Sequence, residues 1–153
     1  MSDTKTETSA ITDLYHQLIN GWNHRDGAAM AACFSDNGSM VGFDGSQVDG
    51  RAEIEAHLSG IFAHHQPAEF VVIVRDIRFF NPDSALLRAV AGMVPPGKTE
   101  IMPAVNAIQS LVASRHDTDW RIELFQNTPA AWHGRPEEVD RLTAELQAKF
   151  NDR

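Results

Sequence analysis

Hydrophobic residues recur every three or four positions near the start of the chain, which is the spacing of one face of an α-helix. The residues on this face are Ile11, Leu14, Tyr15, Leu18, Ile19 and Trp22. The helix begins either at Thr4, whose distance in sequence from Glu7 suits a capping box, or near Ser9. Either start predicts an amphipathic helix that covers a hydrophobic core.

Two more helices are predicted after the first. Asp26 is a suitable N-cap for a short helix that extends to Phe34. The next helix runs from about Arg51 to His65 and is stopped by Pro67.

The segment between the second and third helices is rich in turn residues. Residues 36–38 (DNG) and 44–46 (DGS) are predicted turns, and residues 39–43 between them form a short strand.

The pattern changes from helical to strand-like at about residue 69. Long segments rich in β-branched and aromatic residues cover 69–80, 85–94, 103–115 and 120–126. Short turns connect these segments, so they are predicted to pair as antiparallel hairpins. A last amphipathic helix follows Pro136 and carries a hydrophobic stripe made of Val139, Leu142, Leu146 and Phe150.

Helices followed by an antiparallel meander predict an α+β fold, in which a cone-shaped, curved antiparallel sheet packs against the N-terminal helices. We expect a single domain over residues 1–153, with a core at about 8–130 and a C-terminal extension whose helix lies at about 131–150. The open end of such a cone is a natural ligand cavity.

Composition narrows the possible partners and the compartment. The chain of 153 residues has a formal net charge of −8, and this acidic balance argues against binding nucleic acid. No apolar run approaches the ~20 residues that cross a bilayer, and the polar first ten residues do not resemble a signal peptide. Cys33 is the only cysteine, which suits a reducing compartment. We therefore expect a cytoplasmic protein with no membrane partner.

The motifs in 20–38, 50–62, 74–89 and 120–129 resemble the NTF2-like superfamily, which includes the SnoaL-like polyketide cyclases and the ketosteroid isomerases. More narrowly, they resemble its SgcJ/EcaC branch, whose members have no agreed reaction and come in some cases from natural-product gene clusters. The resemblance implies a cystatin-like α+β barrel. It does not imply one function, because the superfamily includes isomerases, dehydratases, cyclases, hydrolases, transport factors and association domains.

The chemistry of ketosteroid isomerases is not expected here. The resemblance places their catalytic Asp at Gly42 and their helix Tyr at Leu18, and neither residue can exchange a proton. Tyr15 and Asp44 lie close in sequence to those positions and could replace them only through a shift of register. Both therefore remain candidate catalytic residues.

Alternation along the last two strands selects candidate ligand contacts. In the last strand, Gln126 shares a face with the apolar residues Trp120, Ile122 and Leu124, and Asn127 lies on the other face. In the strand before it, Asn106 shares a face with Ile108 and Val112. Amides among aliphatic side chains suit a pocket wall, and we place Gln126 and Asn106 there. The alternative is that these amides bond backbone groups at the strand ends, as Asn127 does when the chain leaves the sheet.

Two arginines on the apolar faces of strands raise the same question. Arg75 and Arg88 either reach the cavity to meet an anion or a carboxylate, or a β-bulge turns them to solvent. His133 is the candidate acid or base of the C-terminal segment if Trp132 folds over the mouth of the cone. The alternative is that Trp132 packs on the outside of the sheet or against a second subunit.

The histidines do not suggest a metal site. A metal site needs three or four ligands that converge on one point, whereas His57 and Glu53 lie on the polar side of the third helix. We therefore expect no metal and no organic cofactor.

Two functions fit the sequence. The first is a pocket for an apolar or aromatic small molecule, lined by Gln126, Asn106, Tyr15, Trp22 and Arg75 with Asn127, with cofactor-free acid–base chemistry at the bound compound. The second is a non-catalytic binding or association module that forms a homodimer through the outer face of the sheet, where Phe80 and Phe125 are expected to point.

Overall fold

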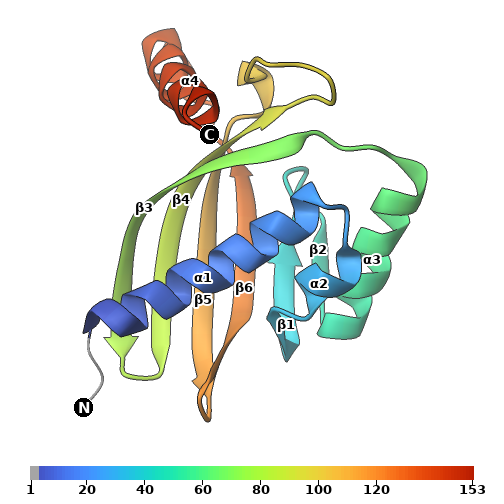
Figure 1. The fold of residues 1–153 in the computed structure, drawn as a ribbon, viewed down its shortest axis with the longest axis vertical. Coiled ribbons are helices and arrows are strands. Elements are labelled where there is room, and N and C mark those ends of the chain that lie inside the picture. The colour runs from blue at the N-terminus through green and yellow to red at the C-terminus, as the bar shows by residue number, and fades with distance from the viewer. Residues whose placement is uncertain (1–3) are drawn as a thin grey trace.

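The computed structural model describes residues 4–153 (Figure 1). The elements in chain order are α1 (Thr4–Asn23), α2 (Gly27–Ala31), β1 (Phe34–Val41), β2 (Gln47–Asp49), α3 (Arg51–His64), β3 (Glu69–Asn81), β4 (Ser84–Val94), the 3-10 helix η1 (Pro103–Val105), β5 (Ala107–His116), β6 (Asp119–Pro129) and α4 (Pro136–Asn151). The α+β order predicted from the sequence is confirmed, including the C-terminal helix.

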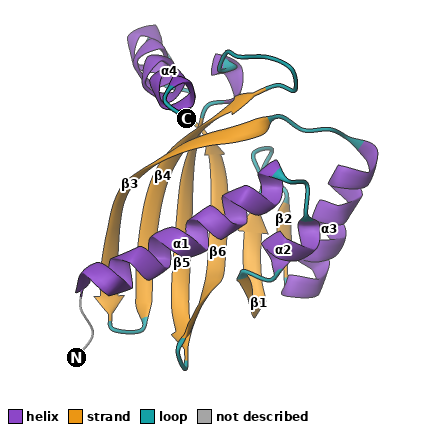
Figure 2. Cartoon of the chain, in the orientation of Figure 1, coloured by secondary structure: helices purple, strands orange, loops and turns teal. Residues whose placement is uncertain are grey.

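All the strands belong to one six-stranded sheet with the order β2-β1-β6-β5-β4-β3. The hairpins β3–β4, β4–β5 and β5–β6 are antiparallel, as is the pair β1–β2. β1 lies between β2 and β6, and its pairing with β6 is parallel. Figure 2 shows the long strands β3 and β4 bending over the end of the sheet, which gives it a cupped shape.

Helix α1 crosses the cupped face of the sheet and buries the stripe predicted from its spacing (Figure 1). Leu18 on the helix and Leu111 on β5 are fully buried in this main core. A second hydrophobic cluster lies on the other face of the sheet, where Leu142 and Leu146 of α4 pack on Val71 and Val90. Helix α4 thus covers part of the outer face. None of the helices between residues 4 and 153 has the length and hydrophobicity to cross a bilayer.

The predicted turn at residues 36–38 is wrong, because this segment lies inside β1. The second helix also ends earlier than expected, at Ala31, and Phe34 already belongs to the strand. Gly38 permits this arrangement: a Cβ at this position would lie 2.6 Å from the backbone oxygen of Ile122 on β6. The register between β1 and β6 shifts between Phe34 and Ser39, so residues 36–38 lie at an irregularity of this strand pair.

Two further differences concern strand boundaries. Residues 47–49 form the short edge strand β2, which the sequence did not predict. Residues 103–105 form a 3-10 helix instead of the start of a strand, because Pro103 lacks a backbone N–H and suits the first turn of a helix. As a result, β5 begins at Ala107, and Asn106 precedes it.

A β-bulge in β6 reverses the predicted faces of the end of this strand. Val112 pairs with Leu124 and the next residue, Ala113, pairs with Ile122, so Glu123 is the extra residue. Trp120 and Ile122 face the main core as predicted, but beyond the bulge the inner side belongs to Phe125 and Asn127. Gln126 is exposed. The prediction that Gln126 points inward and Phe125 outward is therefore wrong.

Candidate functional site

A cavity of about 520 Å³ opens between α1, α3, the β1–β2 turn and the inner face of the sheet. Its volume lies within the range of small-molecule sites, which are about 300–1,000 Å³. Hydrophobic side chains form most of its wall, among them Leu18, Ile19, Met30, Met40, Phe43, Leu58, Ile61, Phe70, Met93 and Phe125. The hollow predicted at the end of the cone is therefore present and apolar.

Trp22 forms one corner of this cavity. Its ring contacts Phe62 and Phe70 at centroid distances of 5.3 and 5.2 Å. Its Nε1 donates a hydrogen bond of 2.9 Å to the carbonyl oxygen of Ala68, so the N–H is already used by the protein. Trp22 therefore offers a ligand the surface of its ring and no hydrogen bond.

The rim of the cavity carries the charged and hydroxyl groups. Asp44, Ser46 and His57 line it, and among residues 4–153 Asp44 and His57 are its titratable side chains. The backbone N–H of Ser46, then its hydroxyl, and further the charge of His57 hold the pKa of Asp44 below its ordinary value. Asp44 is therefore an ionised carboxylate at neutral pH, exposed at the entrance of an apolar cavity.

A chain of buried hydrogen bonds runs from α1 to the wall of the cavity. The hydroxyl of Tyr15 donates to Oε1 of Gln109 at 2.5 Å, and Nε2 of Gln109 donates to Oδ1 of Asn127 at 3.2 Å. Tyr15 and Gln109 are fully buried, whereas Asn127 is half-buried and lines the cavity. Gln109 and Asn127 are also direct partners across β5 and β6, which fixes their side chains on the same face.

Tyr15 does not line the cavity, although the sequence made it a candidate catalytic residue and ligand contact. Burial raises the pKa of its phenol, so the hydroxyl remains protonated. Its proton is donated to Gln109 and is therefore not offered to a ligand. Gln109 was not predicted as a site residue; the available signal was a glutamine between Ala107 and Leu111 on an otherwise apolar strand face.

Asn106 is buried but lies on the other side of the sheet from the predicted position. Its Nδ2 donates a hydrogen bond of 2.9 Å to Oγ1 of Thr143 on α4, and its Oδ1 is near Gly92 and has no hydrogen-bond partner among residues 4–153. It does not line the cavity, because residues 103–105 are helical and change the direction of the chain before β5. The placement of Asn106 in the pocket wall is therefore wrong.

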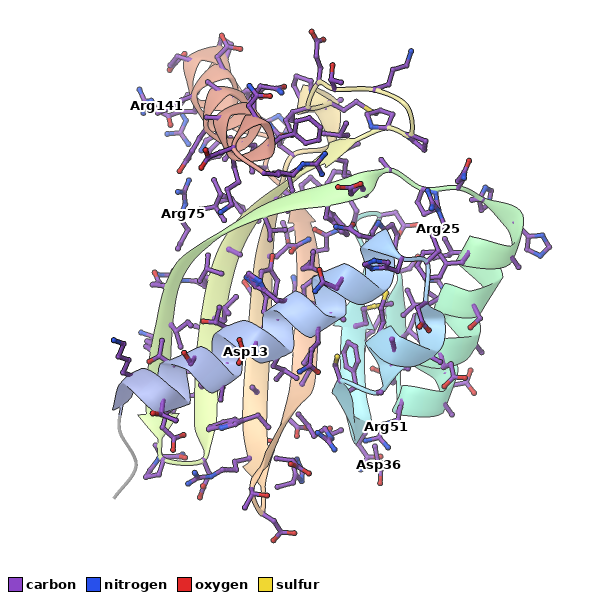
Figure 3. The ribbon with its side chains drawn as sticks, viewed as in Figure 1. Asp13, Arg25, Asp36, Arg51, Arg75 and Arg141 are labelled. Atoms are coloured by element: carbon purple, nitrogen blue, oxygen red, sulfur yellow. The ribbon has the colours of Figure 1, made fainter. Side chains whose placement is uncertain are left out.

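The two arginines also lie outside the cavity. The register of β3 on β4 shifts between Val74 and Asp76, so Arg75 is the residue of a β-bulge, the alternative considered above. The two terminal nitrogens of its guanidinium, Nη1 and Nη2, donate to the carboxylate of Glu145 on α4. Figure 3 shows Arg75 between β3 and α4, away from α1. Arg88 is exposed and pairs with Asp76 at 2.8 Å.

The segment before α4 does not cover the mouth of the cavity. Trp132 packs against the second hydrophobic cluster, together with Ala130 and Phe150, on the outside of the sheet. His133 is exposed and does not line the cavity, so the structure does not bring this candidate to the site. Residues 4–153 contain no group of three or more side chains arranged to hold a metal ion.

The sequence matches a known family model, and the fold is similar to those of solved structures. The SnoaL-like domain model matches residues 11–132. A cystatin-like domain of unknown function from Nostoc punctiforme is 30% identical, with a TM-score of 0.80 over 98% of this chain and 95% of that chain. A ketosteroid isomerase-like protein from Erwinia carotovora atroseptica is 13% identical, with a TM-score of 0.64 over 80% of this chain and 95% of that chain.

A further structural relative is a putative calcium/calmodulin-dependent protein kinase type II association domain from Thiobacillus denitrificans. It is 16% identical, with a TM-score of 0.67 over 76% of this chain and 91% of that chain, so the likeness concerns the fold alone. No curated protein sequence matches the chain significantly. The family model spans most of the chain, and the relative from Nostoc punctiforme matches it almost end to end. The chain belongs to the SnoaL-like domain family, with the NTF2-like fold.

Proposed function

We propose that this protein binds an apolar or aromatic small molecule in the cavity between α1, α3 and the sheet. The observation that carries the proposal is the composition of this cavity. It has a volume of about 520 Å³ and a mostly hydrophobic wall. The amide of Asn127 lies in this wall, and the polar groups of Asp44, Ser46 and His57 lie at the rim. A cavity of this kind supports binding through apolar contact and orientation through a few polar groups.

The charges of the site favour a neutral ligand. No lysine or arginine of the described residues lines the cavity, and the rim carries the Asp44 carboxylate on a chain with a formal net charge of −8. An anionic compound would meet this charge with only His57 as a possible counter-ion. Electrostatics therefore disfavour acidic metabolites and favour uncharged ones.

The rim also supports a chemical role for the site. Asp44 is ionised and lies at the entrance with His57, so these two side chains are the groups that would remove or return a proton at the bound compound without a cofactor. The reactions that this chemistry covers are isomerisation, dehydration, cyclisation and hydrolysis. Asp44→Asn is expected to abolish turnover of a substrate while it leaves the binding of a neutral probe intact.

Fluorescence of the neutral apolar probe N-phenyl-1-naphthylamine tests the binding proposal. The probe is expected to bind with enhanced emission, and Ile61→Trp is expected to weaken binding at least about tenfold by filling the cavity. Ala63→Trp is the matched control, because Ala63 lies on the same helix but is exposed and outside the cavity wall. Equal binding by the protein and its Ile61→Trp variant would exclude this cavity as the site.

A second proposal concerns assembly and is compatible with the first. The outer faces of β4, β5 and β6 carry a row of aliphatic partners, Leu86, Val112 and Leu124. These residues are only partly buried, because they do not belong to the cluster under α4, which includes Val71 of β3 and Val90 of β4. A row of this kind at the middle of an open sheet face supports a homodimer through that face. Phe80 is exposed on the same sheet, but Phe125 is buried and contributes nothing to it.

The narrower affiliation and the compartment are proposals as well. The motifs in 20–38 and 120–129 support membership of the SgcJ/EcaC branch, and with it a compound from natural-product metabolism as the ligand. The single cysteine, Cys33, is buried and free, which supports a reducing cytoplasmic environment.

A further inference from the structure

The side-chain amide of Asn127 has an oxygen and a nitrogen, and only the oxygen forms a hydrogen bond within residues 4–153. Its Oδ1 accepts the hydrogen bond from Nε2 of Gln109 at 3.2 Å. Its Nδ2 has no hydrogen-bond partner among residues 4–153, and the side chain lies in the wall of the cavity. An amide whose oxygen is occupied inside the protein leaves its NH2 group to the hollow.

The orientation of the Asn127 amide depends on Tyr15, two side chains away. The phenol must donate its proton, because Tyr15 is fully buried and Oε1 of Gln109, at 2.5 Å, is the acceptor it meets within residues 4–153. If Gln109 were turned around, its NH2 would face the phenol oxygen and the Tyr15 proton would have no acceptor, which buried hydroxyl groups rarely tolerate. Gln109 must therefore direct its own NH2 to Asn127, and Asn127 must direct its oxygen to Gln109.

This orientation of the Asn127 amide places a hydrogen-bond donor, its Nδ2, in the wall of the cavity. Apolar side chains form most of the wall, and the carboxylate of Asp44 lies at the rim. We infer that the ligand carries a neutral hydrogen-bond acceptor, such as the carbonyl oxygen of a ketone, ester or amide, which accepts a hydrogen bond from Nδ2 of Asn127. This inference rests on the proposed binding function and adds the chemical class of the ligand. Asn127 contacts the ligand, and Tyr15 and Gln109 are positioning residues.

Two neutral probes of similar shape test the inference by displacement of N-phenyl-1-naphthylamine at pH 8. These are 2-acetylnaphthalene, which has a ketone oxygen, and 2-isopropylnaphthalene, which has a methyl group in its place. The protein is expected to bind the ketone roughly five- to tenfold more tightly than the hydrocarbon, which is the contribution of one hydrogen bond.

Asn127→Asp is the decisive variant. The aspartate keeps an oxygen that accepts from Gln109 and presents a second oxygen to the cavity where Asn127 presents NH2. The ketone is therefore expected to lose its advantage and to bind more weakly than the hydrocarbon. Gln126→Glu is the matched control, since it adds the same charge at the neighbouring position, which is exposed on the other face of β6, and the ratio of the two affinities is expected to stay unchanged.

Tyr15→Phe tests whether Tyr15 orients the amides of Gln109 and Asn127 or only stabilises the fold. It removes the proton that orients Gln109, so the preference for the ketone is expected to fall severalfold in protein that circular dichroism shows to be folded. If both probes bind equally in the unmodified protein and in Asn127→Asp, the cavity is a ligand site but the inference is overturned. If neither probe and no N-phenyl-1-naphthylamine binds, the proposed function and the inference both fail.

Discussion

The hydroxyl of Tyr15 on α1 lies 2.5 Å from the side-chain oxygen of Gln109 on β5, and both side chains are fully buried. The first helix and the middle of the sheet therefore share a hydrogen bond inside an otherwise hydrophobic core. A buried polar contact of this kind adds little when it is complete and is destabilising when one partner is lost. It also links the helix to Asn127 in the cavity wall, so one contact serves both the packing and the site.

Tyr15→Phe is expected to lower the free energy of unfolding by about 1–3 kcal/mol, because it leaves Oε1 of Gln109 buried without a donor. Urea denaturation followed by circular dichroism measures the change. The double variant Tyr15→Phe/Gln109→Leu is expected to be more stable than the sum of the two single changes predicts, since it removes both partners. Additive effects would show that the two side chains do not depend on each other.

Gly92→Ala is expected to destabilise the protein by roughly 1–3 kcal/mol. A Cβ on Gly92 would lie 2.8 Å from Cδ1 of Leu146 and 3.2 Å from Cγ2 of Ile101, so these packed side chains would have to move. Gly60→Ala is the matched control, because no atom lies within 4 Å of a Cβ at this helical position and alanine favours the helix. Thermal unfolding compares the stabilities of the two variants. A Gly92→Ala variant that is as stable as the unmodified protein would contradict the close packing of Leu146 on Gly92.

Glu123 is expected to make stability depend on pH in the acid range. Burial alone would raise the pKa of its carboxyl, but hydrogen bonds from Ser114, His116 and Ser35 outweigh this and leave the pKa below its ordinary value. A carboxyl whose pKa is lower in the folded state stabilises the protein above the pKa of the unfolded chain, about 4.3, and loses this effect as the pH falls through the folded value.

Glu123→Gln is therefore expected to be less stable than the unmodified protein at pH 7, and the difference is expected to shrink below about pH 4. Urea midpoints measured between pH 7 and pH 3 give the comparison. Glu55→Gln removes the same charge from an exposed position on α3 and is the control. A difference that stays constant over the whole range would show that the carboxylate of Glu123 is not responsible.

Val112→Glu is expected to separate the proposed dimer into monomers. It places a charge in the middle of the aliphatic row formed with Leu86 and Leu124 on the outer face. Light scattering at micromolar concentration measures the mass, and Ala63→Glu, which adds the same charge at an exposed position on α3, is the control. A monomer in the unmodified protein would exclude the dimer and leave the ligand proposal intact.

Much of the fold could be predicted from the sequence. The stripe from Ile11 to Trp22 faces the core as its spacing requires, and the four long segments after residue 69 form the predicted hairpins. These elements are long and periodic, so many residues contribute to the same pattern. The apolar cavity could also be anticipated, because a curved sheet with helices on one face leaves a hollow at its open end.

The side chains that line the cavity could not be read from the same patterns. Each bulge adds one residue to a strand and reverses the faces beyond it, so Gln126 turns outward and Asn127 inward, and Arg75 meets Glu145. A bulge depends on the neighbouring strand and leaves no trace in the alternation of the strand that contains it. The role of Gln109 could not be predicted either, because its partner Tyr15 is 94 positions away in the sequence.

The sequence by itself determined the order of helices and strands and the apolar faces, because local spacing decides which residues lie on one side of an element. Only the tertiary structure decided which polar groups reach the cavity. That outcome depends on strand register and on hydrogen bonds between distant elements, and these form when the helices and the sheet pack together.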